Sequence, residues 1–317
     1  MADGRTQAAE VSASAQFVRE QYVFDGWISA DGSTGYPAEP GRYHLYAQHA
    51  CPFCQRVMIV RALLGLEEAL PATMADPVRD ERGWTFLDAA GRSSDPVNGL
   101  AYLADAYLRT DPGYRGRWTV PTVWDRRTGR IVSNRFDDIT IMLETEFTAF
   151  ARAGAADLYP VALRPEIDAL NARMYHMFNY GVYRAGFATS QSVYEAACAD
   201  VFAMMDELEA RLAGSRYLVG GRLTEADVHA FPTLARFDAV YQTHFKCNLR
   251  RLVDYPALWA YARDLYQRPA FRETTVFDDI KRHYYMSHGH INPTRIVPKG
   301  PAVDWLAPHG REALGPA

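Results

Sequence analysis

The sequence predicts two domains: a small mixed α/β domain over residues 41–150 and an all-helical (all-α) domain over residues 151–290. Three patterns predict this architecture. An apolar strand-like run passes directly into a helix at Cys51-Pro52, and a hairpin followed by a helix comes later in the same domain. Beyond these elements, helical spacing of apolar residues replaces strand-like alternation. A chain of 317 residues is long enough to bury two cores.

The first strand and the first helix lie directly before and after Cys51. Residues 43–47 form the apolar run, and residues 52–65 are compatible with a helix that ends at Gly65. Pro52 then lies in the first turn, where a missing N–H leaves no hydrogen bond unmade. A thiol at this position faces the positive end of the helix dipole and unpaired amide groups. Both favour the thiolate, which is the nucleophilic form.

The motif Cys51-Pro52-Phe53-Cys54 has the C-x-x-C pattern. Beside a strand–helix unit this pattern is typical of a thioredoxin-like redox motif, so the first domain is predicted to be thioredoxin-like. The alternatives are a buried pair of small apolar residues or half of a zinc site. Zinc needs four ligands, and the chain has no second C-x-x-C. His283, His288 and His290 have no carboxylate or cysteine at a regular spacing, so no metal is predicted.

The rest of the first domain contains a long insertion and then a hairpin. Residues 66–118 are loop-rich, with a possible short helix at 100–109, and an insertion of this length is more often functional than accidental. Residues 118–125 alternate like a strand, and residues 131–133 return as its partner. Pro121 suits an edge strand or a cis turn beside the thiol. Asn134 is predicted to cap a helix that begins near Asp137.

The second domain is predicted from helical spacing of its apolar residues. The expected helices are residues 164–179, 192–212, 226–240 and 256–266. Thr224 and Asp227 have the spacing of a capping box, to which we assign a structural role. Two terminal segments complete the chain. Residues 1–40 are predicted as an N-terminal arm whose aromatic stretch 22–28 packs onto the body, and residues 291–317 as an extended tail.

Composition excludes several classes of function. The formal net charge of -4 gives no electrostatic case for nucleic acid or an anionic membrane surface. No apolar run is long enough to span a bilayer, and the N-terminus has no signal-peptide pattern. Four cysteines in a chain of this length do not form a disulfide framework, so a reducing, cytoplasmic location is expected. Of the 34 basic residues, 31 are arginine, which suggests a GC-rich genome.

The combination of Cys-Pro at the first helix, Val-Pro before a hairpin and a helical second domain resembles a glutathione transferase. Blocks in the second half narrow the resemblance to the xi class, the S-glutathionyl-hydroquinone reductases. These blocks are NYGVYRAGFA (179–188), YLVGGRLTEADV (217–228), FPTLARFDAV (231–240), HFKCNLRRLVDY (244–255) and IKRHYYMSHGHINPTRIVP (280–298). The resemblance covers roughly residues 40–301. It implies the glutathione-transferase architecture, a homodimer, a small-molecule quinol conjugate as substrate, and glutathione as co-substrate.

The resemblance also implies roles for individual residues. Cys51 corresponds to the nucleophile, and Tyr183 and Tyr284 correspond to catalytic and substrate-binding phenols. Tyr285 is the alternative to Tyr284 at the substrate. On the thiol side the resemblance implies Trp84, Arg117, and the backbone of Val120 beside Pro121. The plainer alternatives are that the tyrosines are core or interface aromatics and that Arg117 is a solvated surface arginine.

Two departures from the family pattern affect the prediction. The family reads Cys-Pro-Trp-Ala, whereas this chain has Phe53 and Cys54; Cys54 is one helical turn inside and is predicted to be buried. Where the family has an acidic residue and a serine for the γ-glutamyl group, this chain has Arg135-Phe136. An arginine repels the γ-glutamyl ammonium, and a phenylalanine offers no acceptor.

The second departure leaves the partner thiol open. Asp137 and Asp138 could replace the missing acceptors after a shift in register, and glutathione would then remain the thiol. Otherwise a thiol without a γ-glutamyl arm is expected at Arg135 and Phe136, and mycothiol is the candidate that a GC-rich source favours. Two further hypotheses stay open: a dithiol, glutaredoxin-like oxidoreductase that uses Cys51 and Cys54, and a non-enzymatic binding protein on the same scaffold.

Overall fold

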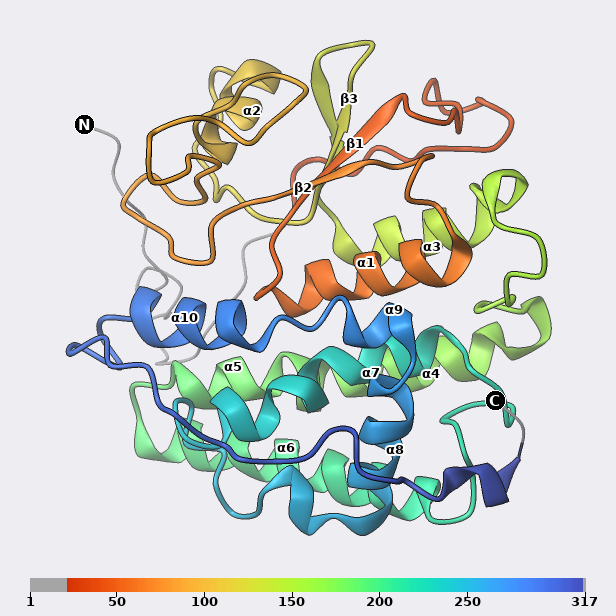
Figure 1. The fold of residues 1–317 in the computed structure, drawn as a ribbon, viewed down its shortest axis with the longest axis vertical. Coiled ribbons are helices and arrows are strands. Elements are labelled where there is room, and N and C mark those ends of the chain that lie inside the picture. The colour runs from red at the N-terminus through yellow and green to blue at the C-terminus, as the bar shows by residue number, and fades with distance from the viewer. Residues whose placement is uncertain (1–21, 316–317) are drawn as a thin grey trace. The chain divides into compact units, whose positions relative to one another are not determined.

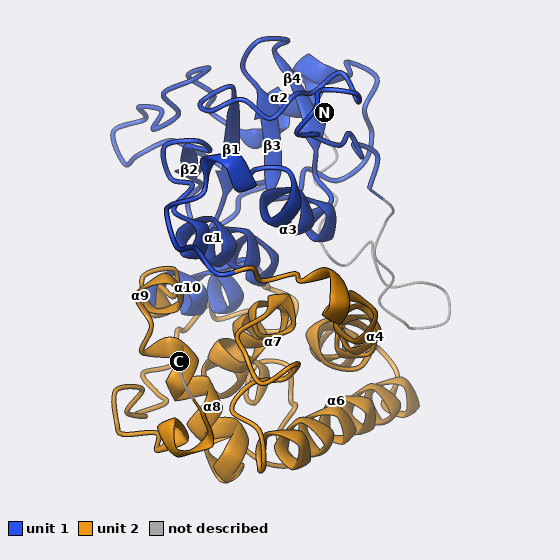
Figure 2. Ribbon diagram, turned by 90° about the vertical axis from the view of Figure 1, so that its right-hand side faces the viewer, with its two compact units in different colours: residues 1–6, 20–156, 278–287 blue, residues 7–19, 157–277, 288–317 orange. Residues whose placement is uncertain are grey.

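The computed structural model describes residues 22–315, which form two compact units, coloured separately in Figure 2. Of these residues, unit 1 contains 22–156 and 278–287, and unit 2 contains 157–277 and 288–315. The sequence predicts a helical domain that runs without interruption to residue 290. The structure instead groups ten residues near its end, 278–287, with the α/β unit.

A mixed four-stranded sheet forms the centre of unit 1 (Figure 1). Its order is β2-β1-β3-β4, with β1 and β2 parallel and the other neighbours antiparallel. The strands are β1 (Tyr43–Ala47), β2 (Ala72–Met74), β3 (Thr122–Asp125) and β4 (Arg130–Ser133). All five residues of β1 and all four of β3 are buried, so the sheet is covered on both faces. This arrangement is the predicted thioredoxin-like architecture.

Three helices cover the sheet of unit 1. They are α1 (Pro52–Leu64), α2 (Leu103–Thr110) and α3 (Phe136–Thr145). Figures 1 and 2 show α1 and α3 side by side on one face and α2 on the other. Helix α1 ends where Gly65 adopts φ 70°, a left-handed conformation that glycine takes without steric cost, and the Gly65 N–H caps the last turn. The predicted end of this helix is therefore confirmed.

The segment before β1 lies along the outer edge of β4. The Gly26 N–H donates to the Val132 carbonyl at 3.0 Å, and the Asn134 N–H donates to the Phe24 carbonyl at 3.0 Å. The Phe24 ring packs edge-on against Tyr107, with ring centroids 5.5 Å apart. These contacts agree with the prediction that this aromatic segment packs onto the body, and they cover an edge that would otherwise present unpaired backbone groups.

Two local predictions for unit 1 were wrong. Residues 66–118 contain a strand, β2, whose three residues are too few to give a periodic signal. Asn134 does not cap α3; the N-cap is Arg135. The Asn134 side chain is buried instead, where its amide donates to the Tyr107 hydroxyl at 3.1 Å and to the Thr119 hydroxyl at 3.2 Å. These hydrogen bonds hold the Asn134 side chain in the interior, and its oxygen does not accept from the first turn of α3.

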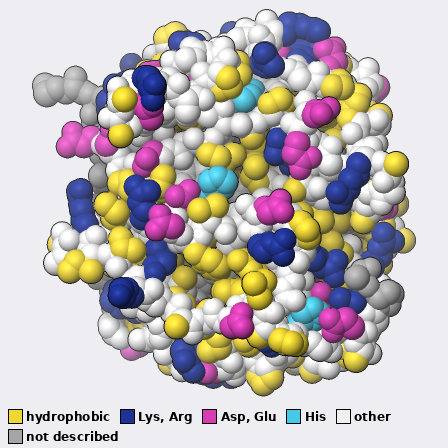
Figure 3. All heavy atoms as spheres, in the orientation of Figure 1, with side chains coloured by type: hydrophobic (Ala, Val, Ile, Leu, Met, Phe, Trp, Pro, Cys, Tyr) yellow, Lys and Arg dark blue, Asp and Glu magenta, His cyan; other side chains and the backbone are white. Residues whose placement is uncertain are grey.

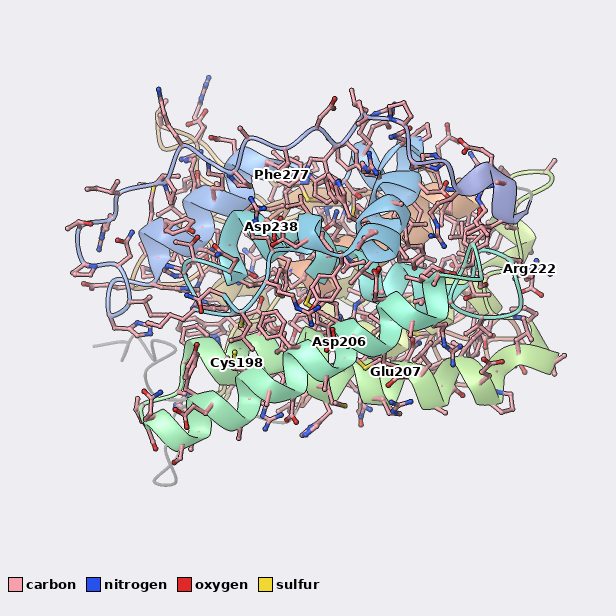
Figure 4. All side chains as sticks on the ribbon, turned by 90° about the horizontal axis from the view of Figure 1, so that it is seen from below. Cys198, Asp206, Glu207, Arg222, Asp238 and Phe277 are labelled. Carbon is pink, nitrogen blue, oxygen red and sulfur yellow. The ribbon has the colours of Figure 1, made fainter. Side chains whose placement is uncertain are left out.

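Unit 2 is helical. Its helices are α4 (Arg164–Met174), α5 (Gly181–Gly186), α6 (Gln191–Leu212), α7 (Glu225–Arg236), α8 (Pro256–Tyr266) and α9 (Pro269–Arg272). Two π-helical turns, Tyr175–Asn179 and Phe237–Tyr241, extend α4 and α7 to about the predicted ends. The longest helix is α6, along which Figure 4 labels Cys198, Asp206 and Glu207.

The last described segment of the chain packs against α6 and α8 of unit 2. Trp305 contacts Trp259, Tyr266 and Phe277, with ring centroids 4.8–5.6 Å apart. The buried Arg311 guanidinium donates to the Leu212 carbonyl at the end of α6 and to the Arg216 carbonyl. A guanidinium at this position satisfies carbonyl groups that a helix end leaves unpaired.

Helix α10 (Phe277–Ser287) brings residues 278–287 into unit 1. The His283 ring stacks on Trp84, with centroids 5.1 Å apart and an interplanar angle of 25°. His283 Nδ1 also lies 2.9 Å from the Pro77 carbonyl oxygen, and the Ser287 hydroxyl accepts from the Arg79 N–H at 3.3 Å. These contacts join residues about two hundred positions apart, and the local periodicity of α10 contains no information about them.

The predicted capping box lies at the start of α7 and gives a first testable prediction. The buried Asp227 carboxylate accepts from the Thr224 N–H at 2.8 Å and from its hydroxyl at 3.1 Å. We expect Thr224→Ala to lower the free energy of unfolding by about 1–2 kcal/mol, because Asp227 loses a buried donor. Urea unfolding of the purified protein measures this change.

A matched control for this prediction is Ser190→Ala. Ser190 is the N-cap of α6, and within the described chain its side chain makes no capping hydrogen bond. Its substitution should therefore change the unfolding midpoint much less. Equal losses in the two variants would contradict a structural role for the Thr224–Asp227 pair.

Surface charge and hydropathy in the structure agree with the composition. On the face drawn in Figure 3, basic and acidic side chains are interspersed, and neither sign forms an extended patch among the residues shown in colour. No helix within residues 22–315 has the length and apolar character needed to cross a membrane.

Candidate active site

Cys51 is the N-cap residue of α1, as the sequence predicts. Its Sγ accepts a hydrogen bond from the Cys54 N–H at 3.4 Å, and Pro52 occupies the first turn. The preceding loop is held by Gln48, whose side-chain oxygen accepts from the Cys51 N–H at 3.1 Å. A sulfur that accepts from an amide at a helix N-terminus gains stabilisation of its negative charge. The site therefore has the local geometry of an activated thiol.

The Val120 carbonyl lies opposite the thiol. Cys51 Sγ donates to this oxygen at 3.6 Å, and the Val120–Pro121 peptide bond is cis. The buried Tyr107 holds the residue before Val120 in place, since its hydroxyl donates to the Thr119 carbonyl at 2.8 Å. The structure thus brings Val120 and Pro121 beside Cys51, although these residues are about seventy positions apart in the sequence.

Trp84 and two predicted tyrosines lie in the same unit as Cys51. Trp84 is buried and stacks on His283. The next two residues on α10 are Tyr284 and Tyr285, and both are buried; the Tyr284 ring packs edge-on against His283 at 5.2 Å. Arg117 is partly buried in the loop before β3, and its carbonyl accepts from the Tyr114 hydroxyl at 2.8 Å. The binding roles of these residues remain predictions.

Phe136 and Phe53, two of the departures from the family pattern, contact each other. Their rings stack with centroids 4.2 Å apart. The buried Arg56 guanidinium lies over both rings, at 5.3 Å from Phe53 and 5.4 Å from Phe136. Phe136 is itself buried, so the start of α3 presents an aromatic ring where the family has a serine. Nothing local in the sequence connects positions 53 and 136, so this contact is not predicted.

The two carboxylates that follow Phe136 are both paired with arginine. Asp137 forms an ion pair with Arg56 at 3.3 Å. Asp138 forms one with Arg135 at 2.8 Å, and burial raises the pKa of Asp138. The alternative by which Asp137 or Asp138 replaces the family's acidic residue stays a prediction, since a carboxylate paired with one arginine keeps further acceptor sites.

Arg79 lies beside Trp84, a contact that the sequence does not predict. Its guanidinium carbon lies 5.3 Å from the centre of the Trp84 ring. Burial lowers the pKa of Arg79, and the negative charge of Cys51 acts in the opposite direction. No signal in the run Asp76–Arg82 sets Arg79 apart, because a loop with alternating charges is usually a solvated one.

Tyr183 belongs to unit 2, on α5. It is buried in a cluster of aromatic rings, with centroids 5.4 Å from Phe245, 5.9 Å from Tyr241 and 6.1 Å from Phe187. A tyrosine with a purely structural role in the core would make the same contacts. The proposed catalytic role of Tyr183 therefore rests on the resemblance to the xi class.

The remaining cysteines and histidines form no evident second site. Cys54 is a buried free thiol, as predicted, and Cys198 and Cys247 are buried free thiols as well; burial raises the pKa of Cys198. His244 Nε2 lies 3.1 Å from His288 Nδ1, and burial lowers the pKa of His244 to about 4. In residues 22–315, no group of three or more His, Cys, Asp or Glu side chains is arranged to hold a metal ion.

Comparison with known proteins identifies the family. Two family models match: "Glutathione S-transferase, N-terminal domain" over residues 50–146 and "Glutathione S-transferase, C-terminal domain" over residues 191–264. A glutathionyl-hydroquinone reductase of Escherichia coli (strain K12) is 45% identical over 308 residues, which cover 95% of this chain and 94% of that protein.

Solved structures give the same result. The crystal structure of a glutathione transferase from Gordonia bronchialis is 53% identical, with a TM-score of 0.90, and the match covers 93% of this chain and 92% of that one. The xi glutathione transferase of Phanerochaete chrysosporium is 45% identical, with a TM-score of 0.87 and coverage of 92% and 99%. The chain therefore belongs to the glutathione S-transferase family and, within it, to the xi class.

Proposed function

We propose that this protein is a thiol-dependent reductase that removes a low-molecular-weight thiol from S-conjugated hydroquinones. The observation that carries the proposal is the position of Cys51, which caps α1, accepts from the Cys54 amide and faces the Val120 carbonyl. The similarity to a glutathionyl-hydroquinone reductase over nearly the whole chain supports the same class of substrate.

The reaction proceeds by thiol exchange at Cys51. The thiolate attacks the sulfur of the conjugate, an S–S bond forms, and the carbon–sulfur bond breaks with its electron pair on the ring carbon. That carbon takes a proton, which releases the hydroquinone. A second thiolate then attacks the mixed disulfide, which gives a disulfide of two small thiols and restores Cys51. The conjugate is thus reduced and two thiol equivalents are oxidised.

Tyrosine hydroxyls are the proposed proton donors and ring contacts. Tyr284, with Tyr285 as its neighbour, belongs to the same unit as Cys51, and the family pattern assigns Tyr183 to the same task. A phenol keeps its proton at neutral pH, so it can donate to a carbanion or enolate as that charge develops.

On the thiol side, we propose that Trp84, Arg117 and the Val120 backbone hold the cysteinyl unit. Val120, next to Pro121, offers main-chain groups to an extended ligand as an added strand would. Arg135 and Phe136 then decide which thiol is accepted. Phe136 is stacked on Phe53, Arg135 is paired with Asp138, and Asp137 is paired with Arg56. This set of contacts favours a thiol that lacks a γ-glutamyl ammonium, and we propose mycothiol ahead of glutathione.

The general function is tested with a synthetic S-conjugate of a hydroquinone and a thiol. The purified protein, supplied with excess free thiol, is expected to release one hydroquinone per disulfide formed, and chromatography measures both products. Glutathione and mycothiol conjugates are assayed in parallel. Absence of hydroquinone release with both conjugates would contradict a reductase function and favour a binding protein on this scaffold.

One observation supports a second candidate function. Cys54 lies one turn after Cys51, and its backbone N–H donates a hydrogen bond to the Cys51 sulfur. Two cysteines in this arrangement are typical of a dithiol oxidoreductase. Cys54 is, however, fully buried, which argues against attack by it on a mixed disulfide. The homodimer proposed from the family pattern is tested by light scattering, and the reducing, cytoplasmic location is proposed from the cysteine content.

A further inference from the structure

One buried hydroxyl, that of Tyr107 on α2, interacts with both residues that flank Val120 and Pro121. On one side it donates to the Thr119 carbonyl at 2.8 Å, and the Thr119 N–H donates to it at 3.2 Å. On the other side it lies 3.0 Å from the Thr122 hydroxyl, within hydrogen-bond distance. Because a hydrogen bond weakens when its distance and angle depart from the optimum, these contacts hold both threonines in place relative to α2.

The Tyr107 hydroxyl is itself held by its neighbours. The Asn134 amide donates to it at 3.1 Å and also donates to the Thr119 hydroxyl at 3.2 Å. The Thr122 hydroxyl donates to the Thr119 carbonyl at 2.6 Å, so these groups form one buried network. Burial raises the pKa of Tyr107, and its hydroxyl therefore keeps the proton that it donates. A phenol oxygen whose hydrogen and lone pairs are in use keeps a single orientation.

The two threonines determine where the main chain of Val120 lies. The Val120 carbonyl is 3.6 Å from Cys51 Sγ, which donates to it. Within residues 22–315, the Val120 N–H donates no hydrogen bond. Val120 thus presents main-chain groups beside the sulfur to which a cysteinyl thiol would be joined. Because a misplacement of about 1 Å at a reacting centre can lower a rate by on the order of 100-fold, the position of this main chain matters to the reaction.

We propose that Tyr107 is a positioning residue of the active site, whose hydroxyl sets the main chain of Val120 for contact with the cysteinyl unit of the thiol. Tyr107 acts through Thr119 and Thr122. The inference rests on the proposed role of Val120 in holding the thiol. It also gives a role to part of the long insertion at residues 66–118, since α2 lies within it.

The test compares two disulfides as reaction partners of Cys51 in the purified protein. One is the disulfide of N-acetylcysteine methylamide, a cysteinyl unit with an amide on each side. The other is 2-hydroxyethyl disulfide, which has no amide. In each reaction the Cys51 thiolate attacks one sulfur, a mixed disulfide forms and one thiolate leaves. Mass spectrometry of the Cys51 peptide measures both rates.

We expect Tyr107→Phe to lower the rate with the cysteinyl disulfide by about tenfold, which corresponds to the loss of about one hydrogen bond. The rate with 2-hydroxyethyl disulfide should stay unchanged, because that probe has no amide for Val120 to hold. The ratio of the two rates is therefore the readout. A purely structural role of Tyr107 would lower the stability and leave this ratio as it is.

The matched control is Tyr43→Phe. Tyr43 is a buried tyrosine at the start of β1, and its hydroxyl donates to the Pro37 carbonyl at 2.8 Å. Its loss removes the same kind of hydrogen bond without a link to Val120, so the ratio should stay that of the wild type. If Tyr107→Phe does not fold, Thr122→Val serves instead, because it removes one hydroxyl of the network and keeps a β-branched side chain in β3.

An unchanged ratio in the folded Tyr107→Phe or Thr122→Val variant would overturn the inference, and so would an equal fall of the ratio in Tyr43→Phe. No hydroquinone takes part in this experiment. Failure of the hydroquinone assay would therefore contradict the proposed function and leave the result for Tyr107 standing.

Discussion

Replacement of Cys51 by serine is expected to lower the rate of hydroquinone release by about a thousandfold or more. A serine hydroxyl stays protonated at neutral pH and cannot form the mixed disulfide through which the thiol leaves. The substitution removes no packing contact of consequence, since Cys51 is partly exposed at the N-cap and serine is itself a favoured N-cap residue. Steady-state kinetics with a synthetic conjugate measures the loss, and an unchanged unfolding midpoint confirms that the fold is retained.

The matched control is Cys54→Ala, which removes the other thiol of the motif and introduces the residue that the family has there. Cys54 is buried and alanine fills most of its volume, so the release rate should stay within the same order of magnitude. A collapse of activity in Cys54→Ala as large as that in Cys51→Ser would favour the dithiol oxidoreductase instead. Substantial activity in Cys51→Ser would refute Cys51 as the nucleophile.

The second large effect concerns the choice of thiol. We expect kcat/KM for a mycothiol conjugate with mycothiol to exceed that for the glutathione pair by about 100-fold. The reason is that a γ-glutamyl ammonium would lose its water next to Arg135 and Phe136 without gaining an acceptor. The double variant Arg135→Glu/Phe136→Ser restores the charge and the hydroxyl of the family pattern. It should raise kcat/KM for the glutathione pair by on the order of tenfold or more.

The control for thiol choice is Phe136→Leu, which keeps an apolar side chain and adds no acceptor. It should lower the stability slightly through loss of the stack on Phe53, and it should not improve the use of glutathione. A wild-type protein that uses the glutathione pair at least as well as the mycothiol pair would refute the preference. In that case Asp137 or Asp138 would supply the acceptor for the γ-glutamyl ammonium.

The elements that the sequence predicts well are those with local signals. The Cys51-Pro52 junction combines a strand end, an N-cap and a proline in the first turn, and the structure has each of them there. Thr224 and Asp227 are a fixed distance apart within one turn of α7, so their spacing alone indicates the pair. The boundaries of α6 and α8 follow from long, regular apolar spacing.

The features that the sequence did not reveal depend on contacts between distant segments. Arg79 is ordinary within its loop, and only the folded structure places its guanidinium over the Trp84 ring, which stacks on His283 of α10. Phe53 and Phe136 both differ from the family pattern, and only the structure shows that their rings stack on each other. Asn134 does not cap α3, because the Tyr107 hydroxyl of α2 holds its side chain in the interior, and no local pattern in the sequence indicates this contact.

The path of the chain through the two units affects how genes for such proteins can recombine. Within residues 22–315 the chain leaves unit 1 at Ala156 and returns to it for residues 278–287, so the described part of the thioredoxin-like unit is encoded in two separate stretches. A crossover between them that exchanges only the first stretch would pair Trp84 and Pro77 of one parent with the α10 of another. Chimeras of xi-class proteins should therefore keep activity more often when the two stretches are inherited together.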